Sequence, residues 1–335
     1  MKDLRGKLAT LPKTLMNALR QAWIRRSAMQ RATALLGAAA FSGLFLVSAA
    51  GVASPWFPRL ETFSDLQGHF AAGAAALALA GLVLRSRRWV TTAVLLVVLN
   101  LGAMGGRMAT VDSCPVQTAA TGRHIVRVMT LNIRDTNRDY PAVERVIGER
   151  RPDIVVIEEF RQHHRAMLAR LRGAYPHQLL CLGRPDCGIA IISRYPLEGK
   201  RVIGGQTLAA LATRAVIGDS TLTVVGAHMS RPFSGRHQQR QFRLLTQAVD
   251  ALPQNAVVVG DFNSTLWSAN LARYARTSGV CASNVTHATW PQWLGPFGVP
   301  IDHVFLKRGV KLLSLHTVSK TGSDHRGIVA SLSMR

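Results

Sequence analysis

The sequence is poor in cysteine and in acidic residues. Its four Cys (114, 181, 187 and 281) include no Cys-x-x-Cys pair, and no His stands at ligand spacing beside them, which argues against a structural zinc site. Asp and Glu number 18 against 41 Lys and Arg, so the net charge is +23, of which residues 107–335 carry +14. Such a chain attracts nucleic acid, phospholipid headgroups or phosphorylated small molecules, although a codon bias toward Arg would give the same charge.

Charge is missing altogether from three long apolar runs. They cover residues 32–53, 66–84 and 89–106, which is 22, 19 and 18 positions. A helix needs about 20 apolar residues to cross a bilayer, so we predict three transmembrane helices in an anchor of residues 32–106. Gln67, His69 and Asn100 weaken the second and third runs. The alternatives are a buried helical hairpin and, for the first run, a signal peptide cleaved near Ala53.

The cations around these runs predict the topology. A basic leader, residues 1–31, holds eight Lys and Arg, and Arg85, Arg87 and Arg88 separate the second and third runs. Positive charge favours the cytoplasmic side of a bacterial cytoplasmic membrane, so after three crossings everything beyond Arg107 is expected outside.

All four Cys belong to that outer part, where disulfides persist. Cys181 and Cys187 flank a turn-forming stretch and are the favoured pair, and Cys114 with Cys281 is the other.

Beyond a linker, residues 107–123, β-branched runs alternate with amphipathic segments, without repeats or low-complexity tracts. Strands are expected at 124–133, 153–157, 188–193, 211–217, 221–227, 256–259, 301–306, 310–318 and 327–332, and helices at 140–149, 161–172 and 235–251. This mixture predicts an α/β fold in which two sheets pack face to face and are covered by helices.

Polar side chains stand at the ends of these strands, where loops meet solvent and sites are built. They are Asn132, Glu159, His228, Asp261, Asn263, Asp324 and His325, and Asp302, with His303, lies inside an apolar string. Singly, each has an ordinary explanation, such as a turn cap or a core histidine. Together, carboxylates, amides and histidines are the set that holds a hard divalent cation and moves protons around a phosphate.

In this order and context, residues 124–335 resemble the endonuclease/exonuclease/phosphatase family. The resemblance rests on Leu-Asn-Ile-Arg at 131–134, Asp-Ile-Val-Val-Ile-Glu-Glu at 153–159, Gly-Asp-Phe-Asn at 260–263 and Ser-Asp-His at 323–325. It implies a four-layer α/β sandwich, here preceded by transmembrane helices, and a phosphate-ester hydrolase that uses Mg²⁺ or Mn²⁺. The whole chain is similar to the membrane-anchored bacterial branch of the family.

The resemblance also implies which residues would hold the metal. Glu159 would be the principal ligand, Asn132 would help to hold the metal and the phosphate, and Asp324 would sit beside the metal. Arg134 stands where some nucleases of the family have an acidic residue. Glu158 replaces a common Gln, and could either add a ligand or face away on the other side of its strand.

Five further residues are implied in catalysis. Asp261 would orient or deprotonate the attacking water, and Asn263 would donate to a phosphate oxygen. His325, oriented by Asp302, would bind the phosphate or transfer a proton. His228 would stabilise the phosphoryl oxygens or protonate the leaving group.

The substrate remains open between several classes. Tethering beside the membrane favours a lipid-linked phosphate or a phospholipid, and the alternative is an extracytoplasmic nuclease acting on DNA or RNA. A non-catalytic anion-binding module is a second alternative. A channel or transporter subunit fits poorly, because three modest Ala- and Gly-rich spans are typical of an anchor. No protein partner is inferred.

Overall fold

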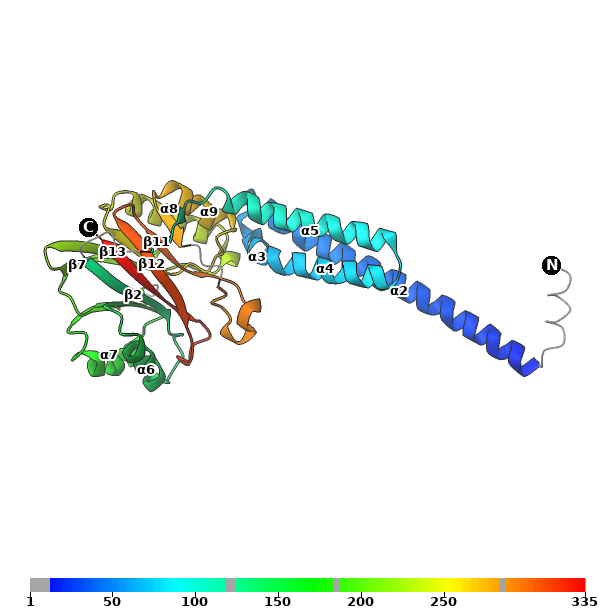
Figure 1. The fold of residues 1–335 in the computed structure, drawn as a ribbon, viewed down its shortest axis with the longest axis horizontal. Helices are drawn as coiled ribbons and strands as arrows, with labels where there is room; N and C mark the ends of the chain where they lie inside the picture. The colour runs from blue at the N-terminus through cyan, green and yellow to red at the C-terminus, as the bar shows by residue number, and fades with distance from the viewer. Residues whose placement is uncertain (1–12, 119–123, 183–186, 284–286, 335) are drawn as a thin grey trace.

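The computed structural model describes residues 13–118, 124–182, 187–283 and 287–334. Three long helices, α2 (Lys13–Ala53), α4 (Gln67–Val83) and α5 (Arg87–Met108), lie side by side and extend away from an α/β domain (Figure 1). The short helices η1 (Pro58–Leu60) and α3 (Glu61–Asp65) connect α2 to α4 at the end of this bundle that meets the domain.

Two of these helices are long and apolar enough to cross a membrane, namely α2 over Ala28–Ala53 and α5 over Arg87–Met108. The middle run passes the same test only when Pro58–Asp65 and Gln67–Val83 are joined across a bend of 54°. The structure therefore contains two candidate spans, or three if the bent pair counts as one, where the sequence predicts three.

Helix α2 begins well inside the predicted basic leader. Neither Gly nor Pro interrupts the chain between Lys13 and Leu36, so the second half of the leader continues the first apolar run as one helix. The first twelve residues of the leader lie outside the described part of the chain. Helix α5 begins after Ser86, whose hydroxyl accepts a hydrogen bond from the backbone N of Trp89 at 3.4 Å.

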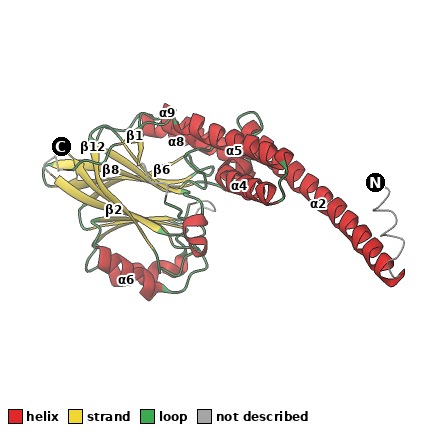
Figure 2. Ribbon diagram, turned by 45° about the vertical axis from the view of Figure 1, so that its right-hand side comes forward, coloured by secondary structure: helices red, strands yellow, loops and turns green. Residues whose placement is uncertain are grey.

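The domain is built on two sheets (Figure 2). The first has the order β1 (Ser113–Cys114), β10 (Cys281–Ser283), β11 (Asp302–Leu306), β9 (Ala256–Asp261), β8 (Ser220–His228), β7 (Ala209–Ile217) and β6 (Leu197–Ile203). The second has the order β12 (Val310–Val318), β13 (Gly327–Met334), β2 (His124–Asn132), β3 (Ile154–Glu158), β5 (Ile189–Ser193) and β4 (His177–Cys181). The central pairs β8–β9 and β2–β3 are parallel.

Helices cover the outer face of each sheet. The second sheet is covered by α6 (Tyr140–Arg150), η2 (Gln162–His164) and α7 (Arg165–Leu171), and the first by α8 (Arg236–Asp250) and α9 (Ala269–Thr277). A third apolar cluster, rich in Val and Ile, fills the space between the two sheets. The predicted four-layer α/β sandwich is therefore confirmed, and its core strands are apolar on both faces because both faces are buried.

The sequence does not predict four strands and one α-helix of the domain, namely β1, β4, β6, β10 and α9. Strand β1 lies inside the predicted linker and pairs with β10, and Val116 bridges to Leu312. The linker is thus partly built into the sheet, while its residues 119–123 lie outside the described part of the chain.

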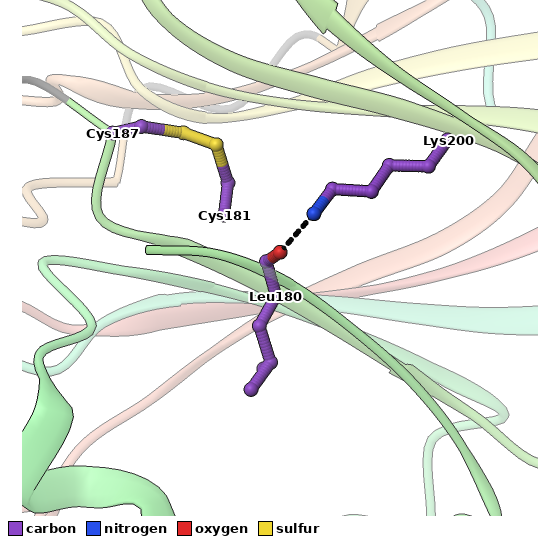
Figure 3. Close-up of a disulfide and its surroundings, with 4 residues drawn as sticks. All are labelled: Leu180, Cys181, Cys187 and Lys200. Atoms are coloured by element: carbon purple, nitrogen blue, oxygen red, sulfur yellow. Dashed lines mark hydrogen bonds between the residues drawn. A yellow bond between two sulfur atoms is a disulfide. The ribbon is translucent and has the colours of Figure 1, made fainter. Parts of the chain in front are cut away.

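Both cysteine pairs form disulfides. Cys114–Cys281 joins β1 to β10, and Cys181–Cys187 closes the short loop after β4 (Figure 3). Beside this second disulfide, Lys200 Nζ donates to the backbone O of Leu180, which ties β6 to β4. No free cysteine is found among the residues that the structure describes.

Candidate active site

The strand register brings the polar strand ends of both sheets to one edge of the sandwich. Asn132 and Glu158 are partners at the carboxyl ends of the parallel pair β2–β3. In the other sheet, Asp261 at the end of β9 is the partner of His228 on β8 and of Asp302 on β11. Because the sheets pack face to face, the two sets of side chains meet between them.

The backbone at this edge is held in unusual conformations. Glu159, Arg134 and Asn263 have φ values of 55°, 61° and 47°, in the left-handed region that side chains other than glycine rarely adopt. Gly260, just before Asp261, has φ 143°, and a Cβ there would lie 1.9 Å from the O of Ala227, so no other residue fits. Strain of this kind is typical of functional sites.

Asn132 links the two acidic strand ends. Its Nδ2 donates to Glu159 Oε1 and to Asp261 Oδ2, each at 3.0 Å. Its Oδ1 accepts from the backbone N of Arg134 at 2.9 Å, which fixes the orientation of the amide. Asn132 is fully buried, so this arrangement holds two carboxylates close together at the base of the site.

Glu159 is half-buried and faces the site. Burial raises the pKa of Glu159, but the Asn132 hydrogen bond, the charge of His228 and the backbone N–H of Asp135 outweigh it, so the pKa lies below its ordinary value. Glu159 is therefore ionised at neutral pH and available as a ligand for a cation.

Asp261 is almost fully buried and receives several donors. Its Oδ1 accepts from the backbone N of Asn263 at 2.8 Å, and its Oδ2 accepts from Asn263 Nδ2 at 3.2 Å. The Asn263 amide also donates to the O of Met229 at 2.9 Å. Burial raises the pKa of Asp261, and the negative charge of Asp302 raises it further. The charge of His325 opposes this shift without cancelling it.

His325 forms a buried pair with Asp302. Its Nδ1 lies 3.0 Å from Asp302 Oδ2, and its Nε2 lies 3.8 Å from Asp261 Oδ2. Burial lowers the pKa of His325, but the charges of Asp302 and Asp261 outweigh burial and raise it to about 10. Flanked by two carboxylates, the imidazole is a fixed cation that faces the site.

The last two predicted residues lie nearer the solvent. His228 Nε2 is 3.6 Å from Asp261 Oδ2 and 3.9 Å from Glu159 Oε1, so it belongs to the same cluster. The carboxylate of Asp324 instead accepts a hydrogen bond from Trp290 Nε1 at 3.0 Å. Asp324 lines the same cleft as Glu159, but the structure pairs it with an aromatic side chain rather than with the carboxylate cluster.

The sequence left open whether Glu158 adds a ligand, and the structure places it away from the cleft. Glu158 is fully buried, and its Oε1 accepts from Thr130 Oγ1 at 2.6 Å. Burial raises its pKa well above the ordinary value, and the nearby Asp302 and Asp261 add to the shift.

Two supporting residues were not singled out from the sequence. Ser323 Oγ donates to the O of Asn132 at 2.7 Å and accepts from the N of His325 at 3.0 Å, so it joins two of the motifs. The position of Ser323 in the Ser-Asp-His motif could have identified it from the sequence. Thr289 Oγ1 accepts from the N of Asp302 at 3.2 Å and has no comparable signal, because thirteen residues separate the two.

A cleft of about 920 Å³ is lined by Glu159, His228, Asp261, Asn263 and His325, and the buried Asn132 and Asp302 lie beneath its floor. Three arginines, Arg134, Arg161 and Arg231, line its walls and could pair with an anion, although Arg161 lies 3.8 Å from the carboxylate of Asp135 in the same lining. Thr62, Asp65 and Leu66 also line it, so one wall comes from the helical bundle rather than from the sandwich.

A profile described as the Endonuclease/Exonuclease/phosphatase family matches residues 129–325, which is more than half of the chain. The chain belongs to this family. Its site residues are thus found within the matched segment, whereas the helical bundle lies outside it. A search of curated proteins found no significant match.

Solved structures of the family share the fold. An endonuclease/exonuclease/phosphatase from Beutenbergia cavernae DSM 12333 matches with a TM-score of 0.53 and 21% identity, over 63% of this chain and 72% of that one. D. rerio TDP2, solved with a single-strand DNA product, matches with a TM-score of 0.52 and 17% identity, over 63% and 99%. Beta toxin from Staphylococcus aureus, solved with bound magnesium ions, matches with a TM-score of 0.48 and 17% identity, over 63% and 100%. At these identities the likeness to the first two structures establishes the fold alone.

The donors at the base of the cleft fit a hard divalent cation. The carboxylates of Glu159 and Asp261 converge on one amide group, the Nδ2 of Asn132, and carboxylate oxygens are the ligands that such a cation prefers. The Oδ1 of Asn132 accepts from the backbone N of Arg134 in this arrangement. Within the described residues, one group of three, Asp261, Asp302 and His325, also has ligand atoms within 4.8 Å of one another. The two groups share Asp261, and in the second the Nδ1 of His325 is already paired with Asp302.

Proposed function

We propose that this chain is a metal-dependent phosphoric ester hydrolase. The observation that carries the proposal is the convergence of Glu159, Asn132, Asp261 and the Asp302–His325 pair at the floor of an arginine-lined cleft. Family membership supports hydrolysis as the reaction class. An anion entering this cleft would meet the three arginines of its walls and a floor that holds both proton acceptors and proton donors.

The metal-holding residues are Glu159 and Asn132, with Asp261 alongside and Asp324 at the wall of the cleft. When bound, Mg²⁺ or Mn²⁺ would polarise the phosphate and offset the negative charge that develops on its oxygens. Glu159 is well suited as the main ligand because it is ionised, half-buried and directed by hydrogen bonds from Asn132 and Asp135.

The remaining residues act on the water and the phosphate. Asp261 orients and deprotonates the attacking water, and its own position is held by Asn132 and Asn263. Asn263 and His228 border the cleft and donate to the phosphoryl oxygens. His325 presents a positive Nε2–H to the reacting group, because Asp302 occupies its Nδ1 and fixes the ring.

The surroundings of the cleft favour a substrate that is part of a membrane. Five aromatic side chains, here called the aromatic rim, are 59 to 76% exposed: Trp56, Phe57, Phe233, Trp293 and Phe297. Trp56 and Phe57 follow the end of α2, and η3 (Pro232–Ser234), which carries Phe233, packs on η1. Exposed aromatic side chains of this density mark an interaction surface and are enriched at membrane–water interfaces.

The other rim residues also adjoin the bundle. Trp293 and Phe297 lie on η4 (Gln292–Phe297), whose last carbonyl lies 2.6 Å from His69 Nε2 on α4. With α2 and α5 spanning the bilayer, the rim would lie at its surface and the mouth of the cleft beside the headgroups. We therefore propose a lipid-linked phosphate or phospholipid as substrate.

The location follows from the same arrangement. We propose that residues 32–106 anchor the chain in a bacterial cytoplasmic membrane and that residues 124–335 lie on its outer side. The cations before the first span and at Arg85–Arg88 support this orientation, and so do the two disulfides in the outer domain.

The test is hydrolysis by the full chain in detergent micelles, with bis(4-nitrophenyl) phosphate and 4-nitrophenyl phosphate as general substrates. Release of nitrophenol that requires Mg²⁺ or Mn²⁺, stops with EDTA and is lost in Glu159→Gln is the expected result. A folded protein that binds these esters without cleaving them would instead identify an anion-binding module.

A further inference from the structure

Two acidic residues of the helical bundle, Glu61 and Asp65, are buried against the catalytic domain. They are the only acidic residues in the predicted anchor, residues 32–106, and both belong to α3. Glu61 is 0% and Asp65 is 5% exposed, although α3 lies at the outer end of the bundle. Burying a carboxylate costs free energy unless it is hydrogen-bonded. The hydrogen-bond partners of Glu61 and Asp65 therefore show which parts of the catalytic domain these two residues contact.

Asp65 holds the loop that follows the catalytic strand β9. Its Oδ1 accepts from the backbone N of Thr265 at 2.8 Å and from Thr265 Oγ1 at 2.9 Å. Its backbone O accepts from Trp267 Nε1 at 3.2 Å. This loop follows Asp261, the last residue of β9, and carries Asn263. Thr265, which Asp65 binds, therefore lies two residues after one proposed catalytic group and four after the other.

Glu61 and Arg107 extend the same contact. Glu61 Oε1 accepts from the backbone N of Asn270 at 2.7 Å, at the start of α9. Arg107, at the end of α5, donates to Ser64 Oγ at 2.7 Å and to the O of Trp267 at 3.3 Å. It also donates to the O of Gly51 at 2.9 Å, near the end of α2. One guanidinium thus joins the outer ends of two long helices and the catalytic loop.

From these contacts we propose that α3 of the anchor is part of the active site, with Asp65 as a positioning residue for the β9–α9 loop. The inference rests on the proposed hydrolase function and goes beyond it, because it makes the rate depend on a residue outside the domain that the family profile matches. Asp65 supplies the acceptor that Thr265 N needs, and it also forms part of the cleft wall. Asn263 has a left-handed backbone, which the surrounding structure must hold in place, and the loop that follows it is held by Asp65.

The experiment compares variants of the full chain in micelles, with kcat, KM and thermal midpoint measured for each. Asp65→Ala is expected to lower kcat by about 10- to 100-fold with little change in KM, because the loss is of alignment rather than of substrate contact. Asp65→Asn keeps an oxygen in place to accept both hydrogen bonds and is expected to restore most of kcat. Thr265→Val combined with Asp65→Ala should cost no more than the larger single change.

Glu61→Ala is the matched control, since it removes an equally buried carboxylate of the same helix that does not line the cleft. It is expected to lower the thermal midpoint as Asp65→Ala does, while kcat changes little. Equal losses of kcat in both variants, or a kcat for Asp65→Ala within about twofold of the parent, would overturn the positioning role.

Amide hydrogen exchange separates this proposal from the proposed function. In Asp65→Ala, exchange over residues 262–268 should quicken while exchange over β2 and β3 does not change. A parent protein without phosphoesterase activity would end the hydrolase proposal, and the exchange result would still decide whether Asp65 holds the loop. Unchanged exchange in that loop would contradict it.

Discussion

His325 Nδ1 lies 3.0 Å from Asp302 Oδ2, and both side chains are buried at the floor of the cleft. This pair keeps the imidazole positive and directs its Nε2 toward Asp261. Asp302→Asn is therefore expected to lower kcat by about 10²- to 10⁴-fold, because an amide cannot stabilise the imidazolium in that orientation. Steady-state kinetics at saturating metal measure the effect, and Asp250→Asn, an exposed carboxylate at the end of α8, is the control. Comparable rates in the two variants would rule out a catalytic role for the pair.

Glu159→Ala is expected to abolish metal-dependent hydrolysis while the domain remains folded, because the side chain faces the cleft and not the core. The loss of rate should be at least about 10²-fold, and His325→Ala should behave similarly. Added Mn²⁺ should raise the thermal midpoint of the parent and not of Glu159→Ala, since a ligand that binds only the native state stabilises it. Glu149→Ala, on the exposed face of α6, serves as the control. Near-normal turnover of purified Glu159→Ala would refute the metal assignment.

The topology can be tested with fusions to a reporter that is active only outside the cytoplasm. A fusion at Arg335 should be active, and one after Arg87 should be inactive, because the cations flanking the spans favour the inside. The same cells should show Cys114–Cys281 and Cys181–Cys187 in their oxidised forms when thiols are labelled before and after reduction. The reverse pattern of reporter activity would put the catalytic domain in the cytoplasm.

Because His303 is buried, the free energy of unfolding is expected to fall in mild acid. Burial lowers its pKa from 6.5 to about 4, although a hydrogen bond to the O of Ser264 opposes the shift. The unfolded chain takes up a proton on this histidine near pH 6.5, and the folded chain does so only near pH 4. The contribution of His303 to the free energy of unfolding is therefore complete above pH 6.5 and is lost as the pH falls toward 4. The free energy of unfolding should fall by about 2 kcal/mol between neutral pH and about pH 5 from this group alone. His303→Gln should reduce that dependence and the exposed His316→Gln should not; identical pH profiles for all three proteins would contradict the assignment.

Much of the domain was predictable because its strands are continuous apolar runs. The runs at 153–157 and 256–259 lie within a residue or two of β3 and β9, and the polar residues that follow them lie at the site as expected. Strands β4 and β6 were missed since they lie at sheet edges and contain Gln178, Glu198, Lys200 and Arg201, which weaken the apolar pattern. Helix α9 was missed because it is short, and its N-cap Ser268 is fixed by the fold around it.

The contribution of the anchor to the site was not predictable from local sequence. Asp65 and Thr265 are 200 residues apart, and nothing in either segment points to the other. In the sequence, Glu61 and Asp65 lie between the first two apolar runs, and no motif there connects them to the site. Their role depends on how α3 packs against α9, which is a property of the tertiary structure. The pairing of Asp324 with Trp290 likewise depends on tertiary structure, since 34 positions separate the two residues and both line the cleft.

The central claim is hydrolysis of a phosphate ester presented by a membrane, and a competition measures it most directly. The full chain, reconstituted in vesicles that contain a polyprenyl phosphate or an anionic phospholipid, is given plasmid DNA in the same Mg²⁺ buffer, with the inactive Glu159→Ala protein alongside. The account predicts metal-dependent release of phosphate or headgroup from the vesicles, little nicking of the DNA, and a lower rate on vesicles when the aromatic rim is changed by Trp293→Ala and Phe297→Ala. Efficient nicking without release from the vesicles would contradict it, and would make the positive charge of the outer domain a surface for nucleic acid.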